Sequence, residues 1–344
     1  MPPSAYARIS AQRRLLVAVA ATSRRPLLGH DEVEIAGIPA TLNRPRRPRH
    51  LPAFVFVNGV TAPGRRHPDV QRLASTLARA GHAVLVPDPT GLAQGAITVA
   101  TAQSLIAAVD AFARSPDAPG GRVRLLGVSL GTTLALLAAQ DPRLRDRVDL
   151  VAGIAPYTDA TNVIRLATTE HHLVAGALVP YPVPDFLRLV AARTLVAWLD
   201  DGPDRDLLGA ALAAVGDDDP DPLAAVRALP LAGLGGDTRS LVDVLLNTDP
   251  GRFEALFARV PARVRRSAAA LSPIRAAGSL HAPVLLVSAP RDRYFPIEES
   301  QALVRLAPHA RLIVTTALRH ADLRPARIAD LARIDALAVR ILAG

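Results

Sequence analysis

The sequence predicts an α/β protein with a mostly parallel central sheet flanked by helices. The first observation behind this prediction is that short, continuously apolar runs alternate with longer helix-like segments. Strands that are apolar throughout are typical of parallel sheets that helices cover on both faces. The second observation is that the alternation stops after residue 155 and resumes after residue 271. The chain therefore combines a sheet-forming core with one long insertion.

The expected elements of the core follow in order along the chain. We expect strands at 33–42, 53–57, 83–86, 123–126, 149–154, 283–288 and 311–316. We expect helices at 70–80, 99–113, 132–139 and 296–307. His82 stands just before the third strand, and we interpret it as structural.

The insertion has a different pattern. Helix-like runs at 187–199 and 205–215 are separated by joints rich in Pro and Asp, such as 216–222, and no convincing strand is present. We therefore expect three parts. They are an N-terminal helical extension (1–31), an α/β core (32–155 with 272–344) and a mainly helical insertion (156–271).

The strongest chemical signal is the pentapeptide Gly127-Val128-Ser129-Leu130-Gly131. It reads Gly-x-Ser-x-Gly between an apolar run and a helix-like run. Strand, tight turn and helix form the context of a nucleophile elbow, which projects its serine from the edge of a sheet. The flanking residues are small because strand and helix nearly touch there. Ser129 is therefore the candidate nucleophile, and the alternative is a glycine-rich turn that carries a solvated serine.

A serine hydroxyl needs a base, and that base needs an acid to orient it. Asp292 and His320 each follow one of the last two expected strands, and 28 residues separate them. That spacing fits one helix and one strand, so both loops are expected at the same sheet edge as Ser129. Asp159 follows an earlier strand and is the rival acid. Asp322 is too close to His320 in the chain to orient it.

In these features the chain resembles the α/β-hydrolase family, over the whole of the expected core. Ser129 in its elbow, Asp292 before Phe-Pro, and His320 match the family's nucleophile, acid and base in order. The chain departs from the family pattern at Ala289, where Gly is common, and at Asn58, where His is common. Neither departure removes a catalytic group.

The resemblance places an oxyanion loop at Asn58-Gly59-Val60, after the strand 53–57. An oxyanion that develops during acyl transfer needs preorganised N–H donors. The resemblance implies that these donors are the backbone N–H groups of Val60 and Leu130. An ordinary turn at a strand end is the alternative, because Asn-Gly also favours turns.

The resemblance also implies that the insertion is a helical cap, which shapes the substrate pocket and excludes water. Apolar side chains in this segment favour a hydrophobic substrate, although most of them are expected in the cap's own core: Tyr157, Leu173, Val174, Leu178, Tyr181, Phe186 and Trp198. We expect a serine hydrolase that cleaves a carboxylic ester of a hydrophobic small molecule, without a cofactor. A thioesterase, acyltransferase or peptidase would use the same residues. A catalytically silent binding protein on this fold is the alternative from another class.

Composition limits the partners. The chain has no cysteine, so it has no disulfide, no Cys-based metal site and no thiol nucleophile. The formal net charge is +9. The densest basic segment, 44–50, is expected to be a solvated hairpin loop, and it lacks the interleaved aromatic residues of a single-strand nucleic-acid platform. We therefore expect a small-molecule substrate and no nucleic acid.

The cluster Glu170-His171-His172 is not expected to bind metal, because adjacent histidines on a helix face different directions.

The first residues contain Arg13-Arg14, the apolar run 15–21 and Arg24-Arg25. We interpret this segment as an amphipathic helix that packs on the core of a cytoplasmic protein. A twin-arginine signal for secretion is the alternative, although the apolar run is short for a signal peptide and no Ala-x-Ala cleavage site follows it. The run is also too short to span a bilayer, and no other segment has the pattern of a membrane helix.

Overall fold

The computed structural model describes residues 10, 12–13, 27–47, 50–320, 322–323, 335–336 and 338–342. Most of the expected N-terminal extension, 1–31, falls outside these residues. No helix in the described part of the chain is both long enough and apolar enough to cross a membrane.

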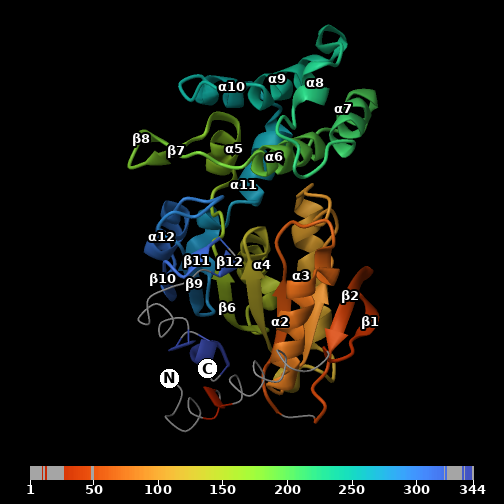
Figure 1. Cartoon of the computed structure of the whole chain (residues 1–344), viewed down its shortest axis with the longest axis vertical. Helices are drawn as coiled ribbons and strands as arrows, with labels where there is room; N and C mark the ends of the chain where they lie inside the picture. The colour runs from red at the N-terminus through yellow and green to blue at the C-terminus, as the bar shows by residue number, and fades with distance from the viewer. Residues whose placement is uncertain are drawn as a thin grey trace.

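Within the described residues, the central sheet has eight strands in the order β1-β2-β4-β3-β5-β6-β9-β10. These strands are β1 (Asp31–Ile35), β2 (Ile38–Asn43), β3 (Ala53–Val57), β4 (Val84–Pro87), β5 (Val123–Val128), β6 (Val148–Ile154), β9 (Val284–Ser288) and β10 (Ala310–Val314). The pairs β1–β2 and β2–β4 are antiparallel, and all other neighbours are parallel. The expected mostly parallel sheet is thus confirmed (Figure 1).

Helices connect the strands and fill the insertion. The helices are α2 (Pro68–Arg79), α3 (Val99–Ala113), α4 (Leu130–Gln140), α5 (Ala160–Thr169), α6 (Asp185–Ala197), α7 (Pro203–Ala213), α8 (Ala224–Arg227), α9 (Gly236–Leu245), α10 (Phe253–Arg259), α11 (Ala262–Ala270) and α12 (Ile297–Leu306). Short 3₁₀ turns are η1 (Gly64–Arg66), η2 (Pro119–Gly121), η3 (Pro142–Leu144), η4 (Leu231–Gly233) and η5 (Pro273–Ser279). Two small hairpins pair β7 (His171–Val174) with β8 (Ala177–Pro180), and β11 (Leu318–Arg319) with β12 (Asp322–Leu323).

Alternate residues of β3 face two layers of helices. Phe54 and Phe56 pack with α2 and with the C-terminal residues 338–342. Val55 and Val57 belong to the larger core cluster, which includes side chains of α3 and α4. Successive side chains of a strand point to opposite faces. All of β3 is buried, so the sheet is covered on both sides, as the continuous apolar runs predict.

The structure corrects two expectations near the N-terminus. Residues 33–42 are not one strand, because Ala36 and Gly37 have positive φ of 49° and 79° and turn the chain between β1 and β2. The basic segment 44–50 is not a hairpin loop, because β2 pairs with β4 and not with β3. The segment instead leads past β4 to the next strand; its residues 48 and 49 lie outside the described ones.

The insertion, 156–271, contains α5 to α11, which Figure 1 shows gathered at one end of the sheet. The expectation that it contains no strand is wrong, because β7 and β8 form a hairpin there. The turn at its tip, Ala175-Gly176, has φ values of 50° and 85°. Two consecutive positive φ values match the twist of a two-residue hairpin. Ala-Gly is a weaker turn signal than Asn-Gly, so these four-residue strands escaped the sequence pattern.

Candidate active site

Ser129 lies on the turn between β5 and α4. Its backbone has φ 54° and ψ −127°, a conformation that is strained for a residue with a side chain. The N–H of Ser129 donates to the carbonyl oxygen of Ile154 on the neighbouring β6 at 2.7 Å. Its own carbonyl accepts the N–H groups of Thr132 and Thr133 at 2.9 and 3.3 Å. These bonds hold the strained turn in place, and this is the geometry of a nucleophile elbow.

The glycines on either side of Ser129 permit this turn. A Cβ on Gly127 would lie 2.4 Å from Cα of Thr132. A Cβ on Gly131 would lie 2.1 Å from the carbonyl oxygen of Val57. No real side chain tolerates such distances, so only glycine allows β5, α4 and β3 to approach each other here.

Asp292, in the loop between β9 and α12, lies beside His320, which directly follows β11 in the segment after β10. Nδ1 of His320 is 2.9 Å from Oδ1 of Asp292. Both residues are buried, with 6% and 8% of their surface exposed. The rings of Tyr294 and Phe295 meet the imidazole edge-on, with centroids 4.7 and 5.9 Å away. A hydrogen bond in such apolar surroundings is strengthened, so Asp292 can orient the imidazole and stabilise the imidazolium.

The carboxylate of Asp292 is oriented by the backbone of its own loop. Its Oδ1 accepts the N–H groups of Tyr294 and Phe295 at 2.8 and 3.0 Å, in addition to its bond with His320. Its Oδ2 is buried and has no hydrogen-bond partner among the described residues. A carboxylate that is held by neighbouring backbone groups moves with its loop. The position of Asp292 therefore depends on what holds that loop.

Within the described part of the chain, no hydrogen bond joins Oγ of Ser129 to the ring of His320. The structure brings the candidate acid and base together, and the candidate nucleophile is not hydrogen-bonded to the base. Catalytic hydrogen bonds are often long in enzymes without substrate and tighten when substrate binds. A hydrogen bond between Ser129 and His320 in the complex with substrate is therefore part of the function proposed below.

The loop after β3 lies against Ser129, the candidate nucleophile. A Cβ on Gly59 would be 3.3 Å from Cβ of Ser129, so glycine keeps the loop close. Nδ2 of Asn58 donates to the carbonyl oxygen of Gly59 at 2.8 Å, which orients the peptide group that carries the N–H of Val60. Leu130 is the first residue of α4, so its N–H has no acceptor within the helix. Both N–H groups remain the proposed oxyanion donors.

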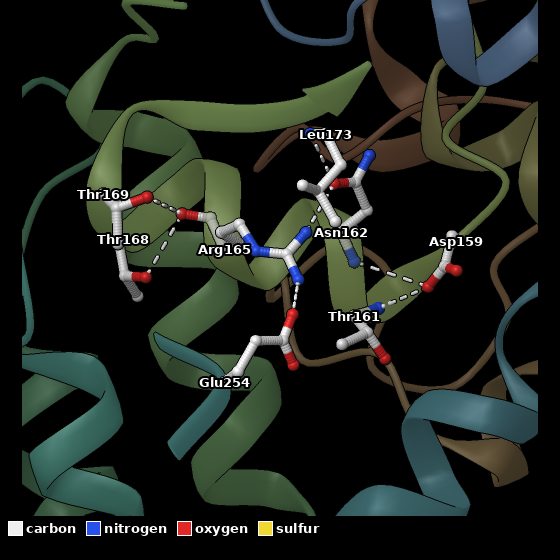
Figure 2. A network of polar contacts seen from close by, with 8 residues as sticks. All are labelled: Asp159, Thr161, Asn162, Arg165, Thr168, Thr169, Leu173 and Glu254. Carbon is white, nitrogen blue, oxygen red and sulfur yellow. Dashed lines mark hydrogen bonds and ion pairs between the residues drawn. The ribbon is translucent and has the colours of Figure 1, made fainter. Parts of the chain in front are cut away.

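The rival acid, Asp159, is engaged elsewhere. Its carboxylate accepts the N–H groups of Thr161 and Asn162 at 2.9 and 3.4 Å and so caps α5. Figure 2 shows this cap, and shows Asn162 in contact with Arg165, which pairs with Glu254. A side chain that accepts the first N–H groups of a helix is an N-cap. None of these contacts reaches the candidate base.

A buried carboxylate that the sequence pattern did not indicate ties α12 to the start of the insertion. Oε2 of Glu299 accepts the N–H groups of Thr158 and Asp159 at 2.7 and 2.9 Å. Its Oε1 accepts Nδ2 of Asn162 at 2.5 Å. Burial raises the pKa of Glu299 above its usual value of 4.5, and these hydrogen bonds offset the rise only in part. Glu299 thus joins the helix that follows the acid loop to the first helix of the insertion.

We expect Glu299→Gln to change how stability depends on pH. Because folding raises the pKa of Glu299, the folded protein holds this proton more tightly than the unfolded chain does. The resulting stabilisation is complete below the unfolded pKa and is lost as pH rises through the folded pKa. The penalty of the substitution, measured as the change in unfolding free energy, should therefore shrink between about pH 4 and about pH 8. Chemical denaturation of both proteins at the two pH values checks this, and a penalty that grows with pH would contradict it.

The cluster Glu170-His171-His172 is not on a helix, which corrects the expectation from sequence. Glu170 ends α5 with φ 55°, and the two histidines begin β7. On a strand they point to opposite faces. His172 is buried, and Nδ1 of His171 is 2.7 Å from the carbonyl oxygen of Thr169. In the part of the chain that the structure describes, no three His, Cys, Asp or Glu side chains gather in a way that could hold a metal ion.

The insertion touches the acid loop directly. Oη of Tyr181, which follows β8, donates to the backbone carbonyl oxygen of Asp292 at 2.5 Å. The ring of Phe186, on α6, meets the ring of Tyr294 edge-on at 6.3 Å. Tyr294 in turn touches the imidazole of the candidate base. Sequence reasoning treated Tyr181 only as an apolar cap residue, because nothing in its local pattern indicates a partner more than a hundred residues away.

The same helix, α6, also touches the loop after β4. Oγ1 of Thr194 donates to the carbonyl oxygen of Gly95 at 3.1 Å. A Cβ on Gly95 would lie 3.2 Å from Cγ2 of Val190 and 3.4 Å from Cγ1 of Val60. Helix α6 therefore lies beside Tyr294 near the candidate acid and base, and beside Gly95, which adjoins the proposed oxyanion loop.

No protein-family model and no curated protein matches the sequence. Solved structures do match. An esterase from Pyrobaculum calidifontis has a TM-score of 0.54 at 18% identity, over 98% of this chain and 92% of that one. Est1E from Butyrivibrio proteoclasticus has a TM-score of 0.50 at 16% identity, over 91% of this chain and 96% of that one. An acylaminoacyl peptidase from Pyrococcus horikoshii has a TM-score of 0.50 at 13% identity, over 88% of this chain but only 39% of that one.

These matches cover nearly the whole chain, and they agree with its eight-stranded, mostly parallel sheet. The chain has the α/β-hydrolase fold. Identities of 13–18% show a likeness in fold, while the reaction has to be argued from the site itself. On the α/β-hydrolase fold, the loops after β5, β9 and β10 share one edge of the sheet. Ser129, Asp292 and His320 lie on these loops.

Proposed function

We propose that this chain is a serine hydrolase that cleaves a carboxylic ester of a hydrophobic small molecule through an acyl-enzyme. The observation that supports this most is the buried hydrogen bond between Asp292 and His320, on loops at the same sheet edge as the strained elbow of Ser129. Backbone strain at a non-glycine residue persists only where the surroundings enforce it, and it often marks a reactive group. An acid that holds a histidine in a fixed orientation is the second requirement of nucleophilic serine chemistry.

Acylation is the first half of the proposed reaction. Oγ of Ser129 attacks the ester carbonyl carbon while His320 accepts the hydroxyl proton. The carbonyl oxygen becomes an oxyanion, which the N–H groups of Val60 and Leu130 would stabilise. The carbon–oxygen bond to the alcohol then breaks, and His320 returns the proton to the leaving oxygen. Throughout, Asp292 accepts a hydrogen bond from Nδ1–H of His320 and stabilises the positive imidazolium.

Deacylation repeats the same steps with water. His320 removes a proton from a water molecule, which attacks the acyl-Ser129 carbonyl carbon. The second tetrahedral intermediate collapses, the carboxylic acid leaves, and Ser129 regains its proton. Every group in this sequence belongs to the chain or the substrate, so no cofactor takes part. Thioesters and amides differ from esters in the leaving group alone, and an acyltransferase would use another acceptor in place of water.

We propose the same three-part organisation as expected from the sequence, with 156–271 as a cap over the α/β core and 1–31 as an extension. Three observations support a cap that borders the site: Tyr181 binds the acid loop, Phe186 of α6 meets Tyr294, and Val190 of α6 lies beside Gly95, which also lies beside Val60. The apolar character of Phe186 and Val190, which lie on α6 beside these loops, supports a hydrophobic acyl group or alcohol.

A panel of substrates tests the proposed function. Carboxylic esters, thioesters and N-acyl peptides of matched acyl length are offered to the purified full chain, with and without an added alcohol acceptor. We expect the highest kcat/KM for esters with apolar acyl groups. If thioesters or peptides are turned over faster than esters, the proposed ester hydrolase would instead be a thioesterase or a peptidase. No turnover of any member would favour a binding protein on this fold.

Phe186→Ala should change acyl preference more than it changes the chemistry. Phe186 and Val190 are four residues apart, so they share one face of α6. Enlarging the space beside Tyr294 should shift the optimum towards longer or branched acyl groups. The shift in relative kcat/KM should be about 10- to 100-fold, because a methylene in an apolar pocket contributes roughly 1–3 kcal/mol of discrimination. Turnover of the acetyl ester should change much less. A uniform loss across all acyl lengths would show that Phe186 does not border the acyl group.

A further inference from the structure

The hydrogen bond from Tyr181 to the loop of Asp292 crosses from the insertion to the catalytic core. We propose that Tyr181 is a positioning residue for Asp292, so that the catalytic assembly includes a side chain of the insertion. This inference rests on the proposed function, since it concerns how the acid of that reaction is held. It adds a residue that touches neither substrate nor reacting atoms and acts through Asp292.

Two contacts hold Tyr181 in the position from which it binds the acid loop. Its N–H donates to the carbonyl oxygen of Glu170 at 2.7 Å, which fixes its backbone to the end of α5. Its ring meets the buried ring of His172 edge-on, with centroids 5.4 Å apart. Burial, followed by the nearby charges of Asp292 and Glu298, raises the pKa of the Tyr181 phenol. The hydroxyl therefore keeps its proton and remains a donor at every pH at which the reaction runs.

The hydrogen bond of Tyr181 acts on the catalytic carboxylate through the backbone of the loop that carries Asp292. Tyr181 binds the carbonyl of the peptide that joins Asp292 to the next residue. The carboxylate of Asp292 is bonded to the N–H groups of Tyr294 and Phe295, two and three residues further along the same loop. Oδ2 has no partner in the described residues. Among those residues, the carboxylate is therefore held only by these two N–H groups and by His320. Shifting this loop by a fraction of an ångström would shift Asp292 against His320.

A second contact holds the other end of the same loop. Glu299, in the first turn of α12, accepts hydrogen bonds from Thr158, Asp159 and Asn162 of the insertion. The acid loop between Asp292 and α12 is therefore bound to the insertion at both ends. Loss of the Tyr181 hydroxyl would release the end that carries the catalytic carboxylate and leave the other end attached.

The proposal separates two kinds of residue in the insertion. Phe186 is expected to act on acyl preference and to spare the smallest esters. Tyr181 should act on every ester by the same factor, because the same Asp292 serves them all. Misplacement of a catalytic group by about 1 Å can cost roughly 100-fold in rate. We expect Tyr181→Phe to lower kcat by about 10- to 100-fold, with KM changed by less than about twofold.

The test compares Tyr181→Phe with a matched control, Thr194→Val, in the full chain. The hydroxyl of Thr194 also joins the insertion to the backbone of the core, because it donates to the carbonyl oxygen of Gly95 and accepts the N–H of Ile97, and neither bond involves the acid loop. Both variants lose one hydroxyl and keep their shape. Turnover of acetyl, butanoyl and octanoyl esters of 4-nitrophenol is measured for wild type and both variants. Rates are divided by the concentration of competent sites from the acyl-enzyme burst, so that misfolded protein does not count as a loss of kcat.

A uniform loss of kcat in Tyr181→Phe, with Thr194→Val close to wild type, would support the proposal. The low-field proton resonance of the hydrogen bond between His320 and Asp292 should then broaden or vanish in Tyr181→Phe and persist in the control. A kcat within twofold of wild type, or an equal loss in both variants, would overturn the positioning role while leaving the serine hydrolase intact. Absence of turnover and burst in the wild type would overturn the proposed function, and the inference with it.

Discussion

Ser129→Ala should abolish turnover and leave the fold unchanged. The elbow holds one hydroxyl, and the alanine keeps the same backbone bonds to Ile154 and to the start of α4. Removing the nucleophile of a serine hydrolase costs on the order of 10⁴- to 10⁶-fold in kcat, and the remaining rate comes from binding and the oxyanion donors. The measurement is kcat for the best ester of the panel, together with the thermal unfolding of both proteins.

Ser279→Ala provides the matched control for this prediction. Ser279 is half-buried, and its hydroxyl donates to the carbonyl oxygen of Ala276 within η5, far from the elbow in sequence. This variant should retain wild-type turnover. Turnover of Ser129→Ala within about tenfold of wild type would exclude Ser129 as the nucleophile.

Asp292→Asn should reduce kcat by roughly 10⁴-fold, because an amide leaves the histidine in the wrong tautomer and cannot stabilise the imidazolium. Asp159→Asn should have little effect on kcat. Asp159 caps α5 through the N–H groups of Thr161 and Asn162, and asparagine is an equally good N-cap. Kinetics of the two variants on one ester, with the unfolding free energy of each, gives the comparison.

The two acids follow different strands, so the ranking of these variants decides between two positions for the acid. If Asp159→Asn lost more activity than Asp292→Asn, the acid would belong after β6, and the bond between Asp292 and His320 would be structural. If both variants kept wild-type rates, neither carboxylate would orient the base.

Local patterns in the sequence were sufficient to predict the core of the fold. Continuous apolar runs predicted the parallel strands, since burial on both faces leaves no polar side to a strand. The glycines around Ser129 predicted the close approach that the structure shows, because that geometry excludes any Cβ. The order of Ser129, Asp292 and His320 predicted three loops at one edge, and the structure adds the bond that joins the last two.

Contacts between distant segments were beyond what a local pattern can indicate. The roles of Tyr181 and Glu299 depend on partners in segments far away in the sequence, and neither residue differs in type from an ordinary cap or helix residue. The sequence predicts a single strand at 33–42, because Ala-Gly is a weak turn signal. In the structure, Ala36-Gly37 forms a turn that divides this segment into β1 and β2. The β7–β8 hairpin was missed because its strands are short and its tip is Ala-Gly.

Labelling with a fluorophosphonate probe tests the central claim most directly, since the probe forms a covalent bond with a serine that a neighbouring base activates. The folded full chain is treated with the probe, digested and mapped by mass spectrometry. We predict one adduct, on Ser129, that forms slowly in Asp292→Asn and not at all after denaturation. An adduct on another residue, or ester turnover without any adduct on Ser129, would contradict the assignment of Ser129 as the nucleophile.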